Sequence, residues 1–230
     1  MPTLYHHPLC PHSRFVRLIL AEYGIETQFV EERASERRPE FLAIDPAGRT
    51  PVFVDDDGTA VPGAGVIAEY LDETRGPAVQ AIRLLPAGLH ERVETRRLTE
   101  WFNGKFFEEV TNWLVTEKVY KRFASAGMNG GAPDMDALRV ARANIRPHLR
   151  YIGWLTGQRK WLAGERLSYA DFAAAAHISC ADYFGDVPWD EDENAKHWYQ
   201  RIKSRPAFRP LLADRAPGMM PGPFYCELDF

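Results

Sequence analysis

Short apolar runs at the start of the chain give way to helical spacing further along. Four early runs are short, contain β-branched or aromatic residues and are bounded by turn residues, which predicts strands. They cover residues 3–5, 29–30, 50–54 and 59–61. Apolar residues at intervals of three and four predict helices over about 13–23, 39–44 and 66–74. The order β-α-β-α-β-β-α is that of a thioredoxin-like α/β domain.

Two residues mark the limits of the first predicted helix. Ser13 stands where a hydroxyl would cap the first turn. Gly24 stands where a left-handed residue would end the helix. The helix is therefore predicted to begin near Ser13 and to end at Tyr23.

After Gly88 the apolar spacing is helical throughout, which predicts an all-α bundle. A long helix over about 89–124 is expected to carry an apolar face made of Leu98, Trp101, Phe102, Phe106, Val110, Trp113 and Leu114. Asp134 is expected to cap a second helix, and Ser168 with Asp171 forms a capping box that opens an alanine-rich core helix. The last helices are predicted at about 195–204 and 208–215.

These patterns divide the chain into four parts. Residues 1–78 form the predicted thioredoxin-like domain, and 79–88 form a linker that follows the Gly76-Pro77 break. Residues 89–215 form the predicted all-α domain. The tail, 216–230, is rich in proline and glycine at its start and cannot continue as a helix.

Composition excludes several classes of protein. Of 230 residues, 45% are apolar and 26% charged, as in ordinary soluble globular proteins. No apolar run approaches the roughly 18 residues that span a bilayer, and the first residues lack a secretory pattern, so we expect a cytoplasmic protein without membrane insertion. Three cysteines, Cys10, Cys180 and Cys226, form neither a disulfide framework nor a zinc motif, and the histidines show no metal spacing. We therefore expect no metal.

The formal net charge of −4 hides a partition along the chain. Residues 1–78 hold 7 basic and 13 acidic side chains, residues 79–160 hold 14 and 8, and residues 161–230 hold 7 and 11. The middle part is therefore basic between two acidic parts. A basic middle part permits an acidic protein partner. No nucleic-acid motif is present and the chain is acidic overall, so nucleic acid is not an expected ligand.

Two motifs give the chain a resemblance to a known family. The segment 45–52, Asp-Pro-Ala-Gly-Arg-Thr-Pro-Val, resembles the stretch of cytosolic glutathione transferases that leads to their cis-proline, here Pro51. Residues 161–164 and 167–171 resemble the hallmark of that family's helical domain. The resemblance implies the two-domain glutathione transferase fold, a homodimer and glutathione chemistry.

In that family the reactive group follows the first strand, where this chain has Cys10 and Ser13. One interpretation is that either residue activates a thiolate, because a helix amino terminus lowers the pKa of a nearby thiol. The other is that Cys10 is an idle buried thiol and Ser13 a plain helix cap. The resemblance also leaves Thr50 and Pro51 as residual glutathione-site residues, since the Thr50 backbone is placed to pair with a cysteinyl peptide.

A second family site is altered. Glutathione transferases hold the γ-glutamyl group with an acidic and a hydroxyl residue, and this chain has Gly63 and Ala64 at those positions. The loss of a charged and a neutral hydrogen bond costs on the order of 1.5–3 and 0.5–1.5 kcal/mol. We therefore expect no glutathione cofactor and no ordinary glutathione turnover. The alternative is a glutathione-dependent transferase or a thiol-transfer enzyme that uses Cys10 or Ser13.

The rest of the chain resembles one branch of the superfamily, alphaproteobacterial cell-division regulators that bind filaments of the tubulin homologue FtsZ. The resemblance lies in residues 101–106, 117–122, 175–177, 182–189 and 227–230. It implies a non-catalytic homodimer in the cytoplasm, at the division site, that bundles and curves FtsZ filaments to support constriction. We expect the partner to meet the basic residues Lys118, Lys121, Arg122, Arg139, Arg142 and Arg146 and the tail residues Glu227, Leu228, Asp229 and Phe230.

Both surfaces leave alternatives open. The arginines at 139, 142, 146 and 150 recur at helical intervals, with only Asp134 and Asp136 expected to offset them locally. This stripe is a solvated flank, a face toward an acidic filament, or a contact with the acidic first domain of a twin subunit. The tail either folds back over its own cleft or presents its last residues to a partner, because it has too many apolar residues for a purely solvated extension.

Overall fold

A four-stranded mixed sheet organises the amino-terminal part of the chain. The computed structural model describes residues 1–123 and 130–230. The strands are β1 (Thr3–His6), β2 (Gln28–Glu31), β3 (Val52–Val54) and β4 (Ala60–Pro62), in the order β2-β1-β3-β4. β1 is parallel to β2 and antiparallel to β3, which is antiparallel to β4. This is the predicted thioredoxin-like sheet.

Three helices accompany the sheet: α1 (Pro11–Glu22), α2 (Pro39–Ile44) and α3 (Ala64–Thr74). Short 3₁₀ turns cover Ala34–Glu36 and Gln80–Ile82. Gly24 has φ +66°, as its predicted place after a helix requires, and the Thr50-Pro51 peptide bond is cis. The predicted cap was wrong, because α1 begins at Pro11 and Ser13 lies inside its first turn.

The helical part begins with one uninterrupted run. It comprises α4 (Leu89–Glu100), a π-helical segment (Trp101–Thr111), α5 (Asn112–Val115), a second π-helical segment (Thr116–Tyr120) and α6 (Lys121–Phe123). The predicted end at Ala124 lies outside the described residues. The later helices are α7 (Met135–Thr156), α8 (Tyr169–Tyr183), α9 (Glu193–Lys203), a 3₁₀ turn (Pro206–Phe208) and α10 (Arg209–Leu212). The last predicted helix is therefore shorter than expected and excludes Arg215.

The π-helical winding explains the buried face of the long helix. Leu98, Phe102, Phe106, Val110 and Leu114 are four residues apart and all fully buried. An α-helix turns about 100° per residue, so sixteen residues would place Leu98 and Leu114 about 160° apart. The wider π turn removes this excess rotation and keeps the row on one face.

Trp113 does not belong to that buried face. The sequence placed it there beside Leu114, but Trp113 is 44% exposed. Because the π-helical winding aligns residues four apart, Leu114 continues the buried row from Val110 and its neighbour Trp113 faces outward.

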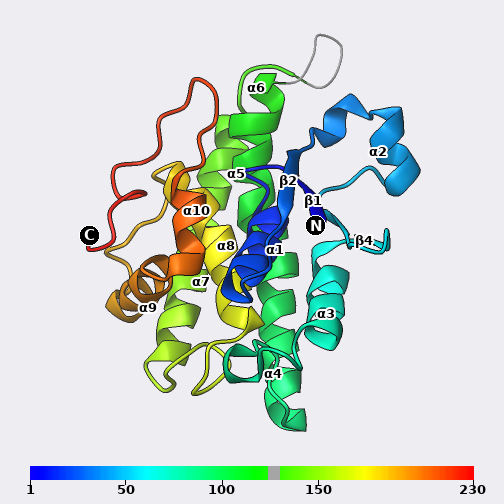
Figure 1. Ribbon diagram of the computed structural model, residues 1–230. Helices are drawn as coiled ribbons and strands as arrows, with labels where there is room; N and C mark the ends of the chain where they lie inside the picture. The colour runs from blue at the N-terminus through cyan, green and yellow to red at the C-terminus, as the bar shows by residue number, and fades with distance from the viewer. Residues whose placement is uncertain (124–129) are drawn as a thin grey trace.

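Helix α8 is the centre of the molecule. All of its residues are buried, and α1 of the sheet domain packs along it, so the two parts share one core. Figure 1 shows α8 behind α1 and close to α7. The predicted capping box is present: Ser168 donates its backbone N–H to Asp171 Oδ2 at 3.0 Å. Asp171 also accepts from the Trp198 indole at 3.0 Å, which ties α8 to α9.

The tail follows a fixed path without helical structure. It leaves α10, loops beyond it and ends beside α9 (Figure 1). Gly222 donates its backbone N–H to the Tyr183 carbonyl at 2.8 Å, at the end of α8. A Cβ at Gly222 would lie 2.7 Å from the Asp182 carbonyl oxygen, so the backbones approach too closely for any larger residue.

Candidate functional site

Cys10 occupies the N-cap position of α1, directly after the loop that leaves β1. Its side chain is 6% exposed, and Sγ lies 3.8 Å from the Thr50 carbonyl oxygen, beside the cis-proline. Burial alone would raise the pKa of this thiol. Interactions with His12 and Ser13 outweigh burial and lower the pKa to about 7. Part of the Cys10 population is therefore thiolate at neutral pH.

His12 connects this thiol to the helical domain. Its Nε2 lies 2.9 Å from the carbonyl oxygen of Asn103, in the first π-helical segment. Its ring packs edge-on against Phe107 and His177. Burial lowers the pKa of His12, but the interactions with Cys10, the Asn103 carbonyl and Glu100 together outweigh burial, and the net shift of the pKa is upward. The arrangement favours a Cys10 thiolate beside a His12 imidazolium.

Ser13 helps to lower the pKa of Cys10 and also holds the loop before α1. Its side chain is fully buried, and its hydroxyl oxygen accepts a hydrogen bond from the His7 backbone N–H at 3.3 Å. That bond fixes the loop before Cys10. Of the two predicted reactive residues, Cys10 is therefore the one that lies beside Thr50, and Ser13 is hydrogen-bonded to the loop that precedes α1.

A cavity of about 610 Å³ adjoins this site, between the sheet domain and the long helix. Its lining includes both remnants of the family's glutathione site, the Thr50-Pro51 turn and the Gly63-Ala64 turn at the start of α3. Gly63 has φ +88°, and no side chain caps α3. The charged pair in the wall joins Glu69 to Arg96 at 2.8 Å. The positions that hold γ-glutamate in the family therefore offer only backbone groups here.

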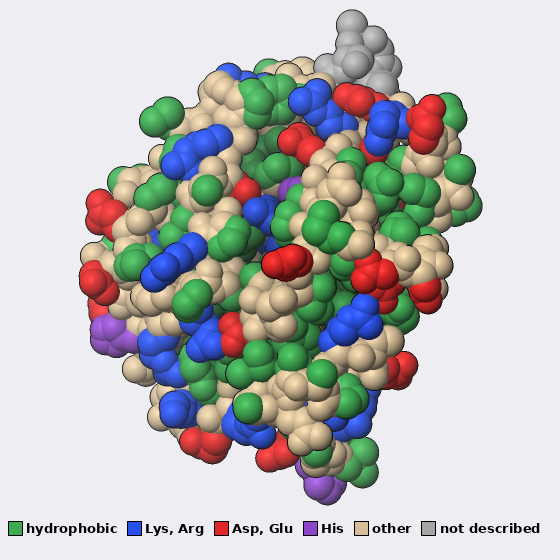
Figure 2. Space-filling view, viewed as in Figure 1, with side chains coloured by type: hydrophobic (Ala, Val, Ile, Leu, Met, Phe, Trp, Pro, Cys, Tyr) green, Lys and Arg blue, Asp and Glu red, His purple; other side chains and the backbone are tan. Residues whose placement is uncertain are grey.

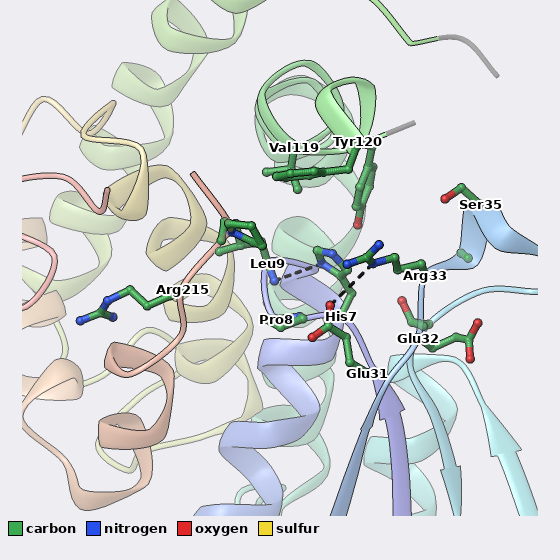
Figure 3. Close-up of a pocket in the computed structure, with 15 residues that line it drawn as sticks. His7, Pro8, Leu9, Glu31, Glu32, Arg33, Ser35, Val119, Tyr120 and Arg215 are labelled. Carbon is green, nitrogen blue, oxygen red and sulfur yellow. Dashed lines mark hydrogen bonds and ion pairs between the residues drawn. The ribbon is translucent and has the colours of Figure 1, made fainter. Parts of the chain in front are cut away.

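A second cavity, of about 180 Å³, lies between the loop before α1, the end of β2, the end of the long helix and the start of the tail. In Figure 3 the Tyr120 ring lies above His7, and the Arg215 side chain extends away from His7. Burial and the nearby Arg33 lower the pKa of His7 to about 4, so its ring is neutral. His7 Nδ1 then accepts the Leu9 backbone N–H at 3.2 Å.

Sequence reasoning missed this second cavity. Its lining comes from four separate segments, residues 7–9, 31–35, 119–123 and 215–217, together with Thr50. None of these segments carries a motif by itself. The available signals were the mixed polar and apolar residues at positions 7 and 9 and the aromatic residues near position 120. Neither signal predicts which segments of the chain come together in the fold.

The predicted basic surface is largely compensated within the chain. Lys118 and Arg142 both bind the Asp186 carboxylate, and Arg146 and Arg150 both bind Glu191. Asp186 and Glu191 lie in the loop between α8 and α9. The expectation that only Asp134 and Asp136 offset the stripe was therefore wrong, because a loop distant in sequence folds against α7.

Two of the other basic residues, Arg139 and Lys121, also have ion-pair partners. Arg139 pairs with Asp136 at 3.0 Å and Lys121 with Glu117 at 2.6 Å. Asp134 instead caps α7 by accepting the N–H groups of residues 136 and 137. Arg122 lies against Gly218 of the tail. Basic and acidic side chains are interspersed on the face shown in Figure 2.

The tail packs against its own chain and still exposes its acidic residues. The Tyr225 side chain is fully buried, and Arg14 donates to its hydroxyl at 3.0 Å. Phe230 packs on Trp189 with ring centroids 4.8 Å apart. Glu227, Leu228 and Asp229 face solvent. The two interpretations of the tail are thus compatible, since packing at 225 and 230 leaves the residues between them accessible.

Neither a membrane segment nor a metal cluster is found in the described ranges. Within residues 1–123 and 130–230, no helix has the length and apolar character to cross a membrane. The same residues bring together no group of three or more His, Cys, Asp or Glu side chains suited to a metal ion.

Comparison with known proteins defines the class. The model of the glutathione S-transferase amino-terminal domain matches residues 4–78, and that of the carboxyl-terminal domain matches residues 129–206. The chain belongs to the glutathione S-transferase family. This confirms the fold expected from the Pro51 and Ser168 motifs.

Particular relatives narrow the position within the family. The chain is 46% identical to FtsZ-localized protein A of Caulobacter vibrioides, over 99% of this chain and 98% of that protein. It matches the solved structure of FzlA from C. crescentus with a TM-score of 0.92, 46% identity, and coverage of 100% and 99%. A glutathione S-transferase structure from Sinorhizobium meliloti 1021 matches with a TM-score of 0.97, 53% identity and full coverage of both chains. The resemblance to the division-regulator branch is confirmed.

Proposed function

We propose that this protein is a non-catalytic homodimer that binds FtsZ filaments, and that it bundles and curves them at the division site in the cytoplasm. The observation that carries the proposal is the 46% identity to FtsZ-localized protein A over nearly the whole chain. The alignment covers 99% of the chain and so extends into the tail, which lies outside both matched domain models. The partner proposed for this chain is therefore FtsZ.

The altered glutathione site supports a role in binding rather than catalysis. Gly63 and Ala64 supply no carboxylate and no hydroxyl to the 610 Å³ cavity. A charged hydrogen bond contributes about 1.5–3 kcal/mol, so the loss weakens glutathione binding about tenfold or more. Cys10 keeps a reactive environment, and any test of function must therefore include thiol chemistry.

A two-fold dimer explains how a binding protein would bundle filaments. Each surface patch is presented twice, once on each subunit. Two weak contacts on neighbouring filaments then reinforce each other through effective concentration. The fixed angle between the subunits would bias filament curvature.

The proposed contact surface combines basic and tail residues. Arg139, Arg142 and Arg146 are exposed on α7. The Arg139–Asp136 pair lies in solvent and contributes little, so Arg139 is free to exchange partners. Arg142 and Arg146 bind mostly buried carboxylates that Lys118 and Arg150 also bind, so neither carboxylate would be left without a cation if these arginines turned toward FtsZ. Lys118, Lys121 and Arg122 extend this surface toward the tail. Lys118 is the most enclosed of the six, since its pair with Asp186 is mostly buried. The tail contribution comes from the exposed residues Glu227, Leu228 and Asp229 and from the segment end at Phe230, which is partly buried against its own chain.

Co-sedimentation with polymerised FtsZ tests the proposal. The protein is expected to pellet with filaments at low salt and to pellet less as salt screens the charged contacts. The same preparation is passed over immobilised glutathione and assayed for conjugation of an electrophile. No pelleting at low salt, together with retention on glutathione and conjugation activity, would favour the transferase alternative at Cys10.

Charge reversal in the tail locates the contact. Asp229→Lys is expected to reduce pelleting, because it introduces a like charge or removes a complementary one at the surface. The matched control is Asp57→Lys, since Asp57 lies in the exposed β3–β4 turn. Equal pelleting of Asp229→Lys and the unmodified protein would exclude Asp229 from the interface.

A further inference from the structure

Phe230, the last residue of the tail, lies in a pocket formed by side chains of α9 and of the loop before it. The Phe230 ring lies 4.8 Å from Trp189 and 6.4 Å from Tyr199, measured between centroids, and stacks on Phe224 at 5.6 Å. The Gln200 amide donates to the Phe230 carbonyl oxygen at 2.9 Å. Both the ring and the main chain of the terminal residue are therefore held.

A buried ion pair forms the floor of this pocket. Lys203 is fully buried, and its Nζ lies 4.4 Å from the centre of the Phe230 ring and 3.3 Å from Asp182 Oδ2. Lys203 also donates to the Phe224 carbonyl oxygen in the tail. A buried ammonium is costly unless it is paired and hydrogen-bonded. The tail supplies the carbonyl and the aromatic face that complete its coordination.

Asp182 links the pocket to the core. It accepts hydrogen bonds from the Trp189 indole and from the Tyr199 hydroxyl, each at 3.2 Å. Those are two of the three rings that contact Phe230, the third being that of Phe224. The carboxylate on α8 therefore orients both aromatic walls of the pocket, and Lys203 as well.

The held ends leave a short exposed bridge. This bridge is the segment of residues 226–229. Tyr225 is buried before it and Phe230 is held after it, so the positions of both of its ends are fixed. Leu228 is 40% exposed at the centre of this bridge, and Glu227 and Asp229 flank it. The bridge presents one apolar side chain between two carboxylates. Its complement is an apolar hollow with Lys or Arg at its rim.

We infer that Phe230 is an anchor and not a contact residue, and that Gln200, Lys203 and Asp182 are positioning residues. Together they hold the bridge, residues 226–229, in one conformation. Its exposed side chains Glu227, Leu228 and Asp229 then form a rigid surface that binds an apolar hollow on FtsZ with basic residues at its rim. The inference rests on the proposed function for the partner's identity. It assigns Phe230 a role different from that of its neighbours, with which it was grouped by sequence.

Hydrogen exchange and filament pelleting, measured on the same variants, test the inference. Phe230→Ala is expected to raise the exchange rate of the Tyr225 and Glu227 amides about tenfold or more, because both donate within the tail. It is expected to weaken FtsZ pelleting about fivefold or more, since an unfixed bridge must be ordered on binding. Leu228→Ala is expected to weaken pelleting with unchanged exchange.

Phe29→Ala is the matched control, because Phe29 is a half-exposed phenylalanine on β2. It should alter neither tail exchange nor pelleting. Unchanged exchange in Phe230→Ala would overturn the anchor. Faster amide exchange in Phe230→Ala with undiminished pelleting would overturn the inference that Phe230 holds the bridge in place for binding to FtsZ. If the unmodified protein fails to pellet, the proposed function fails, while the exchange measurement still decides whether Phe230 is an anchor.

Discussion

Two regions differ in the number of hydrogen bonds made by their side chains. One is the cavity lined by the Thr50-Pro51 and Gly63-Ala64 turns. The other is the tail-docking region, where residues 222–230 pack against α8, α9 and Arg14. In the cavity, Gly63 and Ala64 present no polar side chains, and α3 begins without a side-chain cap. In the tail-docking region, Arg14, Tyr225 and Asp182 are buried and each makes several hydrogen bonds. Buried polar networks that are fully bonded specify a unique geometry. The chain therefore specifies the position of its tail more closely than it specifies a glutathione site.

Arg14 gives the strongest test of that difference. Its fully buried guanidinium donates to the Pro8 carbonyl, the Ser179 hydroxyl, Asp214 and Tyr225, at 2.7–3.2 Å. Arg14→Met is expected to lower the free energy of unfolding by about 3–5 kcal/mol, because it breaks a buried charged network. Urea unfolding measures this.

Arg139→Met is the control for Arg14→Met. Arg139 is 76% exposed in its pair with Asp136, and the change should stay within about 0.5 kcal/mol. A loss below about 1 kcal/mol for Arg14→Met would contradict the importance given to the network.

Two glycine substitutions compare the regions directly. Gly222→Ala is expected to destabilise the protein by about 1–3 kcal/mol, because the added Cβ would meet two backbone atoms at 2.7 Å. Gly65→Ala is expected to stabilise it by up to about 1 kcal/mol, since the site is open and lies within α3. Thermal unfolding of both variants gives the signs. Equal effects would remove the distinction between a closely specified tail and an open cavity.

The smallest expected effect concerns the thiol that remains beside the cavity. In a Cys226→Ser background, the rate of Cys10 alkylation by iodoacetamide should rise with pH to a midpoint of about 7. Cys180 should stay unreactive, because burial raises its pKa to about 12. His12→Ala should move the Cys10 midpoint upward by about one pH unit or more, since the effect of burial remains.

The same shift has a consequence for stability. A thiol with a lowered folded-state pKa stabilises the fold fully above its ordinary value of 9, and this contribution is lost as pH falls toward 7. His12→Ala should remove that pH dependence between 7 and 9. A midpoint near 9 in the unmodified protein would show that His12 does not act on Cys10.

The sequence predicted the fold better than the side-chain roles. Periodicity and capping residues located the sheet, α2 and α8, because these signals are local. Ser13 was misplaced because Pro11 already begins the helix, a position that proline favours. Trp113 was misplaced because α-helical spacing does not apply in a π-helical segment.

The candidate site shows the same limit at longer range. Gly63 and Ala64 were found because a family pattern fixes their positions. The partners of the arginine stripe were missed because Asp186 lies 44 residues from Arg142, and Glu191 lies 45 residues from Arg146, along the chain. The Phe230 pocket carries no sequence signal, since its parts come from α8, α9 and the tail and meet only in the folded chain.

The π-helical segment at 101–111 also sets the direction of everything that follows it. If the same residues had ordinary α-helical winding, the remainder of the helix would be rotated about its axis. Val115 and Val119 would then leave the small core that they share with Tyr183 and Tyr225. Lys118 would turn away from Asp186. The winding of this one segment thus determines whether the far end of the long helix meets the tail.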